Sequence, residues 1–385
     1  MKPEIGIVGG SAAGLFTARV LGRAGMKVRV FEGAERFDPQ SRTLIVTSRL
    51  NDVLGELARQ ARVNEIRRFE LFTDGRVARV SLTSPDLVIE RNRLIRDLAG
   101  AAQASGVRID FGCQFVGLEG DGKGLNLQLR RSSGSTQEAT VNTVVGADGA
   151  FSRVARSAGW PAQATVPLVQ ATVRLPADMP SDTTRVWFIP DDTPYFYWLI
   201  PDSPTTGVAG LIGEDGPATS RALEGFLEKR QLEPLEYQAA RIPVYARWIP
   251  IRRRLQGGDV YLVGDAAGHV KVTTVGGIVT GFRGALGVAE AIISGKPGRR
   301  LRALRRELDV HLLIRKVIHN SDQARYSHLV DLLNARTRKD LEGCTRDEPS
   351  QILWRLCLHQ PRLLLFGLRA LLSGGGFRPN SAAAH

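Results

Sequence analysis

The chain has 385 residues, enough for two packed domains with a sizeable core, and its 43% hydrophobic content and mixed charges exclude a disordered chain. Its three cysteines (Cys113, Cys344 and Cys357) lack CxxC spacing, which excludes a disulfide framework and a zinc site and favours a reducing, cytoplasmic setting. The net charge of +13 fits either an anionic partner or a general composition bias, and no nucleic-acid-binding motif accompanies it.

The N-terminal residues have the pattern of a βαβ unit. Residues 5–9 are a short apolar run, residues 11–24 have helical spacing, and residues 27–32 are a second apolar run. Together they take up about 30 residues, which is the usual length of this motif. The pattern therefore predicts two parallel strands that are joined by a helix.

Further elements follow up to about residue 150. The Asp74-Gly75 pair lies between two apolar stretches and predicts a hairpin turn. A helix is expected over residues 91–105, and a Ser/Gly/Gln-rich loop between two later strands predicts an exposed hairpin end. The two strands that flank this loop are expected at residues 125–129 and 139–145, and a further strand is expected before them at residues 107–111.

From about residue 160 to 254 short apolar stretches alternate with turns rich in Pro, Asp, Thr and Ser, and one helix is expected near residues 220–230. Residues 259–264 return to a buried-strand pattern, and the chain is helical in pattern after Gly276. We therefore expect an α/β fold whose first domain is discontinuous. The expected parts are residues 1–160 with 255–298, an inserted sheet-rich domain at 161–254 to which 70–90 contribute, and a helical C-terminal region at 299–385.

The sequence from Gly9 to Gly14 is a variant of the GxGxxG dinucleotide fingerprint, with Ser11 at the second glycine position. The first glycine permits a tight strand-to-helix turn, and a small second residue lets the backbone approach a pyrophosphate. The helix that follows offers free N–H groups and its positive dipole end to the phosphates. Glu32 ends the second strand, where its carboxylate can accept hydrogen bonds from ribose hydroxyls. Together these features predict a dinucleotide site.

Two later segments combine an acidic residue with glycines at the end of an apolar strand: Asp148-Gly149 and Gly264-Asp265. Asp265 could accept a hydrogen bond from a ribityl hydroxyl. The helix that starts near Gly276 could direct its N-terminus at the flavin edge where negative charge develops on reduction. Each acid by itself would be expected in a cap or a turn. The order and spacing of all three motifs favour a flavin nucleotide instead.

These motifs resemble the superfamily of FAD-dependent aromatic-hydroxylase-like flavoproteins, the group A monooxygenases. Within it, GDAAGHVKVTTVGGIVTGF (residues 264–282) is similar to the geranylgeranyl reductase family, where a glycine follows GDAA and a TT-x-GG stretch leads into the helix. The resemblance implies non-covalent FAD on a Rossmann-type (GR2-like) domain. The contacts that it implies come from Ala13, Glu32, Arg91, Asp265, Gly277 and Ile278, and by position from Ser41, Arg42 and Phe115, besides the motif residues above.

The sequence departs from the reductase pattern in two places. Geranylgeranyl reductases commonly carry a Cys-Gly pair in the loop after the second strand, whereas residues 40–43 contain no cysteine. Val272 and Val275 stand where Pro and Gly are usual. A thiol-dependent step is therefore not implied for this chain.

Residues 196–201 (FYWLIP) resemble the YxWxFP motif of the reductases and also the WxWxIP motif of flavin-dependent halogenases. On a strand, Phe196 and Trp198 share one face, and Tyr195 and Tyr197 share the other. We expect Phe196 and Trp198 to line an apolar substrate cavity beneath the flavin. An ordinary aromatic core strand is the alternative interpretation.

The resemblance implies reduction of C=C bonds in an isoprenoid or lipid-like substrate, with hydride from flavin N5. An isolated alkene is not electrophilic, so the site needs a proton donor, apolar walls and exclusion of water. The candidate donors are Tyr195, Tyr197 and His269. The electron donor is expected to be NAD(P)H or a ferredoxin, and the basic surface would suit an acidic ferredoxin.

Three other functions are considered. The main alternative is an FAD-dependent monooxygenase that hydroxylates an aromatic or polyketide-like small molecule, and a third class is a non-catalytic flavoprotein. A halogenase is disfavoured because that family relays the halogenating species through a lysine, and none occurs between Lys27 and Lys123.

The C-terminal tail has no acidic residue after Glu348, and its many apolar residues alternate with Arg355, Arg362 and Arg369. The pattern predicts two helical segments that are broken at Pro361. A basic amphipathic helix can lie in a membrane interface, and the alternative is a helix pair packed on the protein body. We expect neither a signal peptide nor a membrane span, because no apolar run approaches about 18 uncharged residues.

Overall fold

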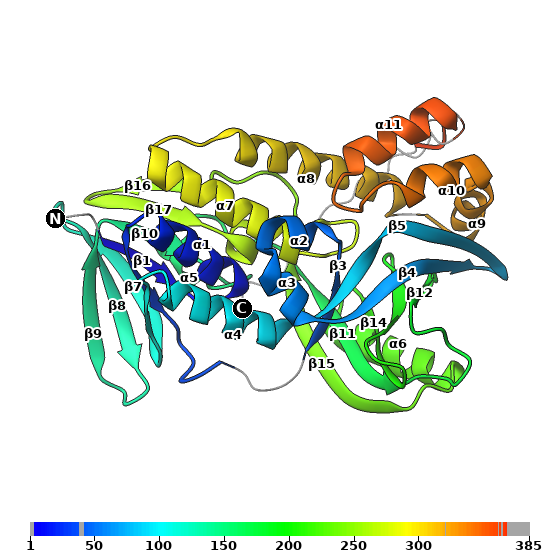
Figure 1. The fold of residues 1–385 in the computed structure, drawn as a ribbon, viewed down its shortest axis with the longest axis horizontal. Coiled ribbons are helices and arrows are strands. Elements are labelled where there is room, and N and C mark those ends of the chain that lie inside the picture. Colours follow the sequence, from blue (N-terminus) through cyan, green and yellow to red (C-terminus); the bar gives the residue numbers. More distant parts are fainter. Residues whose placement is uncertain (1–3, 38–41, 320, 361, 363–364, 368–385) are drawn as a thin grey trace.

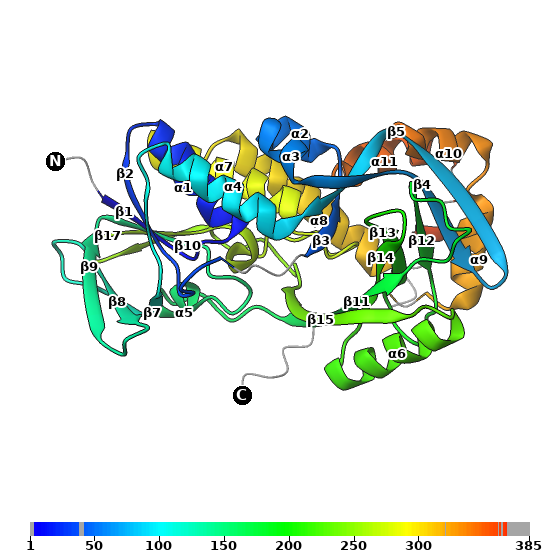
Figure 2. The ribbon, with the colours of Figure 1, turned by 60° about the horizontal axis from the view of Figure 1, so that its bottom comes forward.

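The computed structural model describes residues 4–37, 42–319, 321–360, 362 and 365–367. Two large sheets lie toward opposite ends of an elongated molecule, and a layer of helices runs along one side of both (Figures 1 and 2). The expected α/β class and the Rossmann-type first domain are confirmed.

The first sheet is the parallel sheet that the βαβ pattern predicts. β1 pairs in parallel with β2 and β10, and Ile5, for example, lies opposite Val28 and Thr143. Side chains on both faces of this sheet are buried, as expected for a parallel sheet with covered faces. In spatial order its strands are β16 (Arg252–Leu255), β17 (Gly258–Leu262), β10 (Thr143–Gly146), β1 (Glu4–Val8), β2 (Lys27–Phe31) and β6 (Arg108–Asp110), of which only β16 is antiparallel to its neighbour.

Helices cover one face of this sheet and a small sheet covers the other. α1 (Ala12–Arg23) packs between α7 (Ile278–Ser294) and α4 (Arg91–Gln103) over the side chains of Ile5 and Ile7. On the opposite face Val8 and Phe31 pack against side chains of a three-stranded sheet. Figure 1 shows this small sheet beside β1. That sheet consists of β7 (Cys113–Gly120), β8 (Leu125–Arg131) and β9 (Thr136–Val141).

The second sheet has eight strands and takes three of them from residues 43–90, a longer segment than the expected residues 70–90. The predicted hairpin turn at Asp74-Gly75 is present, with φ of 38° and 73°, the positive values that a primed turn requires. In spatial order the strands are β15 (Pro234–Pro243), β11 (Thr165–Arg174), β14 (Thr206–Ile212), β13 (Tyr197–Pro201), β12 (Thr183–Trp187), β4 (Arg62–Thr73), β5 (Arg76–Glu90) and β3 (Thr43–Val46).

One long-range strand pairing joins β3, β4 and β5 to the other strands of this larger sheet. β4 runs parallel to β12, with Arg68 opposite Thr183 and Phe72 opposite Trp187. Local sequence patterns do not specify such a partner more than 100 residues away. The sheet-rich unit is therefore built from two chain segments and is not a simple insertion.

Several of the remaining helices pack on the second sheet. α6 (Gly216–Lys229) covers one face of the second sheet, and α9 and α10 lie against β4 and β5 (Figure 2). The first tail segment is the helix α11, whereas the second segment lies mostly outside the described residues. No helix in the described part of the chain is both long and apolar enough to cross a membrane. The other helices are α2 (Arg49–Leu54), α3 (Glu56–Ala61), α5 (Arg153–Ser157), α8 (Arg299–Ile318), α9 (Gln323–Leu332), α10 (Ala335–Glu342) and α11 (Pro349–His359).

Candidate FAD site and adjoining cavity

The turn from β1 into α1 has the close backbone contacts that the glycine fingerprint predicts. Gly9 has a φ of +102°, and a Cβ there would lie 2.5 Å from the carbonyl oxygen of Ala147. A Cβ at Gly14 would lie 2.3 Å from the carbonyl oxygen of Gly9. The Ser11 hydroxyl accepts from the backbone N–H of Gly14 at 3.2 Å and caps the helix. A larger residue at either glycine would therefore force the turn open.

Glu32 lies opposite this turn at the end of β2. Its Oε2 accepts from the backbone N–H of Gly10 at 2.5 Å, and its Oε1 accepts from the N–H of Ala34 at 2.9 Å. These bonds hold the carboxylate at the edge of the turn. The position suits recognition of ribose hydroxyls by a carboxylate, as in other dinucleotide sites.

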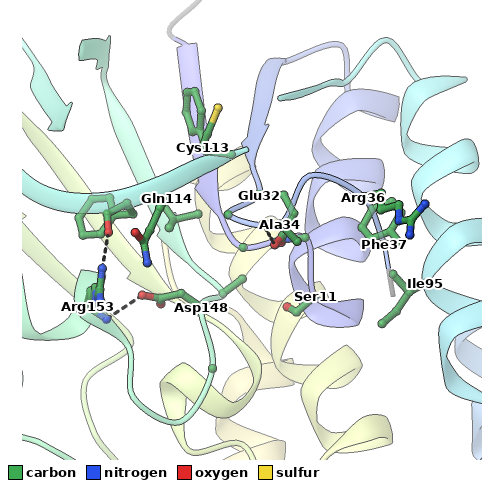
Figure 3. A pocket seen from close by; sticks show the side chains of 18 of the residues that line it. Ser11, Glu32, Ala34, Arg36, Phe37, Ile95, Cys113, Gln114, Asp148 and Arg153 are labelled. Carbon is green, nitrogen blue, oxygen red and sulfur yellow. Dashed lines mark hydrogen bonds between the residues drawn. The ribbon is translucent and has the colours of Figure 1, made fainter. Parts of the chain in front are cut away.

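A cavity of about 590 Å³ opens beside the turn (Figure 3). Its volume lies within the range of small-molecule sites, about 300–1,000 Å³. The lining combines exposed backbone of the turn with an acidic residue at the ribose position, so these residues fit the adenosine part of FAD. Of the residues expected to bind FAD, it is lined by Gly9, Ser11, Glu32, Arg91, Phe115, Asp148 and Gly149.

Asp148 stabilises the loop conformation of the second motif through its hydrogen bonds. Its carboxylate accepts from the Ser152 hydroxyl at 2.5 Å and from the backbone N–H groups of Arg153 and Val154 at 2.7 and 3.1 Å. Burial raises the pKa of Asp148, although these hydrogen bonds act in the opposite direction. Asp148 thus accepts from the first turn of α5, whose N-cap is Ser152, and fixes the loop against the cavity.

The third motif brings Asp265 beside the start of α7. Gly264 has a φ of +61°, and a Cβ there would lie 2.9 Å from the Cβ of Ala13. Burial raises the pKa of Asp265, and the Arg91 guanidinium lowers it. Within the described ranges no group donates a hydrogen bond to the Asp265 carboxylate, so it is free to accept from a bound hydroxyl group. This free acceptor fits the ribityl part of FAD.

α7 begins at Ile278 with Gly277 as its N-cap, and no side chain caps its first N–H groups. A Cβ at Gly277 would lie 3.0 Å from Oδ1 of Asp265, so the glycine allows the close approach of the two segments. Arg91 joins this region to the first cavity, because it lines that cavity and its charge acts on Asp265. The backbone N–H of Arg91 donates to the carbonyl of Arg42 at 2.7 Å, which places Arg42 beside it. Ser41 lies outside the described residues.

A second cavity of about 140 Å³ lies on the face of the second sheet that is opposite α6. Phe196 and Trp198 both line it, as does Gly276 of the third motif. The cavity therefore adjoins the loop that leads into α7. Its walls are mainly apolar, and the full lining is Thr43, Leu44, Ile45, Phe69, Val88, Leu168, Gln170, Thr184, Val186, Phe196, Trp198, Ile200, Val208, Ile212, Thr274, Val275, Gly276 and Arg346.

The two tyrosines considered as proton donors do not line this cavity. The Tyr197 hydroxyl donates to Asp192 at 2.9 Å, and its ring stacks on Phe226 of α6 at 4.3 Å, on the other side of the sheet. Tyr195 packs with Trp198, and the Arg315 guanidinium lies 3.7 Å from its ring centre. The expectation that both tyrosines share one face is wrong, because β13 and its alternation begin only at Tyr197.

His269, the third candidate donor, lies outside the lining as well. It is buried, its ring stacks on Trp248 at 5.5 Å, and burial lowers its pKa to about 4. The imidazole is therefore neutral at neutral pH, and its one N–H is too weak an acid to protonate an alkene. Its position gives it a packing role between Trp248 and Gly284 of α7.

A charged cluster next to the cavity, in which all residues but Arg346 are buried, was not predicted. Arg346 lines the cavity and donates to Asp86, and its guanidinium lies 5.3 Å from the ring centre of Phe69. Lys271 donates to Asp347 at 2.5 Å, and both side chains are buried. These four residues come from distant parts of the chain and form no motif. The only sequence signal was Lys271, a charged residue between the apolar residues Val270 and Val272.

The comparisons with known proteins agree with this site. The model of a family described as the FAD binding domain matches residues 2–304. Geranylgeranyl diphosphate reductase of Rhodobacter capsulatus is 28% identical, over 77% of this chain and 78% of that protein. 6-Methylpretetramide 4-monooxygenase of Streptomyces rimosus is also 28% identical, over 74% of this chain, which spans only 55% of that relative's length.

The same fold occurs in solved structures. A geranylgeranyl bacteriochlorophyll reductase-like protein from Thermoplasma acidophilum superposes with a TM-score of 0.78 over 96% of this chain and 99% of that one, at 17% identity. p-Nitrophenol 4-monooxygenase from Pseudomonas putida superposes with a TM-score of 0.66 over 98% of this chain and 99% of that one, also at 17% identity. At these identities the likeness shows the fold alone, and reductase-like and monooxygenase proteins both have it.

Proposed function

We propose, from the premise that this chain belongs to the FAD-binding-domain family of oxidoreductases, that it reduces carbon–carbon double bonds of an isoprenoid or other lipid-like substrate. The observation that carries the proposal is the cavity walled by Phe196 and Trp198, which adjoins Gly276 of the third FAD motif. A largely apolar cavity beside the flavin motif suits an apolar reacting group. The curated relatives include several geranylgeranyl reductases, which supports the same choice.

The residues that would hold FAD lie just after the ends of strands in the first sheet. Glu32 would bind the ribose, the N–H groups after Gly9 would bind the pyrophosphate, and Asp265 would accept from the ribityl chain. When bound and reduced, FAD supplies hydride equivalents. We propose NAD(P)H or a ferredoxin as the electron donor.

The residues around the second cavity would bind the substrate and exclude water. Val186, Ile200 and Val208 line it together with the aromatic pair, so an apolar segment would be desolvated there. The hydroxyls of Thr184 and Thr274 are buried and have no hydrogen-bond partner within the described part of the chain. Together with the buried Nε of Arg346, which also has no partner among the described residues, they could hold a water molecule or a proton-bearing group against the substrate.

The proposal is tested by anaerobic reaction of the dithionite-reduced holoprotein with geranylgeranyl lipids. We expect flavin absorbance to recover faster with lipid than without it, and the product to gain two hydrogen atoms per reduced double bond in mass spectrometry. Ile200→Trp, which would fill the cavity from a partly exposed position, should retain FAD and lose the lipid-dependent rate. If lipid neither accelerates reoxidation nor gains hydrogen, the proposal fails.

A second candidate function is hydroxylation of an aromatic or polyketide-like compound. The cavity favours this candidate in two respects, its small volume of about 140 Å³ and the guanidinium of Arg346 among the lining groups, which would suit a compact anionic ring. Two of the curated relatives are monooxygenases. Oxygen-dependent NAD(P)H consumption with a hydroxylated product would support this candidate over the reductase.

A further inference from the structure

A third hollow, of about 720 Å³, is lined by residues of α1, α2, α7 and α8. We call it the arginine cleft. It shares no lining residue with the two cavities described above. Its volume is within the range of small-molecule sites. The lining residues are Phe16, Arg19, Val20, Arg23, Arg49, Asp52, Val53, Leu54, Gly55, Val279, Arg283, Leu286, Arg300 and Ala303.

The charges in this cleft are strongly one-sided. Five of the lining residues are arginines and one, Asp52, is acidic. Arg300 pairs with Glu290 at 2.5 Å, and Arg49 pairs with Glu348. The other three arginines have no acidic partner within 4 Å in the part of the chain that the structure describes. They are Arg19 and Arg23 of α1 and Arg283 of α7.

Two of these arginines, Arg19 and Arg283, are partly buried without an acidic partner among the described residues, at a cost that a bound anion would offset. The Nη1 atom of Arg283 is buried and has no hydrogen-bond partner within the described ranges. Burial, and then the charge of Arg23, lower the pKa of Arg19. Unpaired cations that are partly removed from water destabilise the fold unless an anion compensates them. The arrangement is therefore better explained by a ligand than by stability.

The chemistry of the ligand follows from the lining. Guanidinium groups present N–H forks that bind phosphate oxygens in pairs, and several arginines together suit more than one phosphate. The rest of the lining is mainly apolar and includes Phe16, Val20 and Leu286, and we call this apolar part of the lining the floor. We propose that the arginine cleft binds a diphosphate group, with the apolar floor receiving the organic part of the same molecule. A nicotinamide dinucleotide, a prenyl diphosphate and free pyrophosphate share this chemistry.

Binding of inorganic pyrophosphate to the FAD-loaded oxidised protein, measured by calorimetry at low salt, tests the proposal. The exposed Arg23→Glu and the half-buried Arg283→Gln should each weaken binding about tenfold or more, because each removes a charged hydrogen-bond donor. Arg221→Glu is the matched control, since Arg221 is also an exposed helical arginine, on α6. It should leave the affinity within about twofold of wild type. FAD content and the melting temperature show whether each variant is folded.

Three ligands distinguish the sources of the diphosphate. Tighter binding of NADPH, or of a prenyl diphosphate, than of pyrophosphate identifies the organic part that the apolar floor receives. Equal binding of all three supports a free diphosphate site. The proposal is overturned if none of the three binds, or if R23E and R283Q bind as tightly as wild type. These measurements need no turnover, so their failure is separate from a failure of the proposed reductase activity.

Discussion

Glu32 is a single side chain that stabilises the local fold and also lines the candidate cofactor site. Its two oxygens accept from the N–H groups of Gly10 and Ala34, and the same carboxylate faces the first cavity. Its position beside the glycine turn could be predicted from sequence because the fingerprint and the acid lie in one βαβ unit. The cluster around Lys271 and Asp347 could not be predicted in this way.

The first residue-scale prediction concerns Glu32→Gln. The amide keeps the size of the side chain but weakens acceptance from ribose hydroxyls, so FAD should bind about tenfold more weakly. The dissociation constant can be measured by recovery of flavin fluorescence on dilution. Glu119→Gln, an exposed acid on β7, is the control and should leave FAD affinity unchanged. Equal affinity of E32Q and wild type would contradict the assigned role.

The second residue-scale prediction concerns the buried pair of Lys271 and Asp347. Burial raises the pKa of Asp347, but the charge and hydrogen bond of Lys271 and the hydrogen bond from Thr47 outweigh it and hold the pKa at about 2. Lys271→Met leaves an uncompensated buried carboxylate and should lower the free energy of unfolding by about 3–5 kcal/mol. Urea unfolding at pH 7 measures this change.

The double variant Lys271→Met, Asp347→Leu is the matched comparison. Because it removes both charges, it should recover most of the stability lost in K271M. If the single and double variants are equally unstable, the loss comes from packing and not from the unpaired charge.

At the scale of single elements, local patterns predicted most of the fold. The helix at α4 and the hairpin between β4 and β5 lie within a few residues of where the sequence placed them. In β13, Tyr197 faces α6 while Trp198 faces the cavity, as strand alternation requires. The expectation for Tyr195 was wrong because it depended on where the strand begins, and strand ends are weakly encoded.

The packing of α7 against the loop before it allows an element-scale prediction. A Cβ at Gly284 would lie 2.0 Å from Nδ1 of His269. Gly284→Ala must therefore displace the buried imidazole, and we expect a loss of about 1–3 kcal/mol in the free energy of unfolding. Thermal or urea unfolding of the holoprotein would show it.

Gly225→Ala is the control for this helix substitution. Gly225 lies in α6, and a Cβ there would meet no atom within 4 Å. Alanine is a better helix former than glycine by up to about 1 kcal/mol, so G225A should be neutral or stabilising. If both variants lose stability equally, the close contact at Gly284 is not the cause.

At the scale of the whole molecule, buried histidines make stability depend on pH. Burial lowers the pKa of His269 to about 4 and, together with the charge of Lys271, that of His311 to about 3. In the unfolded chain both rings take up a proton near pH 6.5. The neutral, buried rings therefore give their full contribution to the free energy of unfolding above about pH 6.5. This contribution is lost as the pH falls toward 4, because the unfolded state then binds more protons than the folded state.

The variant His269→Phe isolates one of these contributions. Phenylalanine can keep the stacking on Trp248 but cannot be protonated, so the loss of stability between pH 7 and pH 5 should be smaller than in wild type by about 1–2 kcal/mol. Urea unfolding at both pH values gives the comparison. His328→Gln, at an exposed histidine, should leave the wild-type pH dependence unchanged. An H269F curve parallel to wild type would contradict the assigned burial.

The sequence by itself determined the parts that are encoded locally: the βαβ unit with its glycine turn and Glu32, the order of strands and helices, and the FAD-binding class of the protein. These depend on conformational and hydrogen-bonding preferences of residues close together in the chain, which the sequence displays directly.

Only the tertiary structure decided which distant segments meet. The pairing of β4 with β12, the charged cluster of Asp86, Lys271, Arg346 and Asp347, and the convergence of α1, α2, α7 and α8 around the arginine cleft all join residues far apart in sequence. Such contacts form because packing brings charges and strand edges together only after the chain has collapsed. Local sequence patterns do not predict these long-range contacts, because each residue that makes one is common in the kind of segment in which it lies.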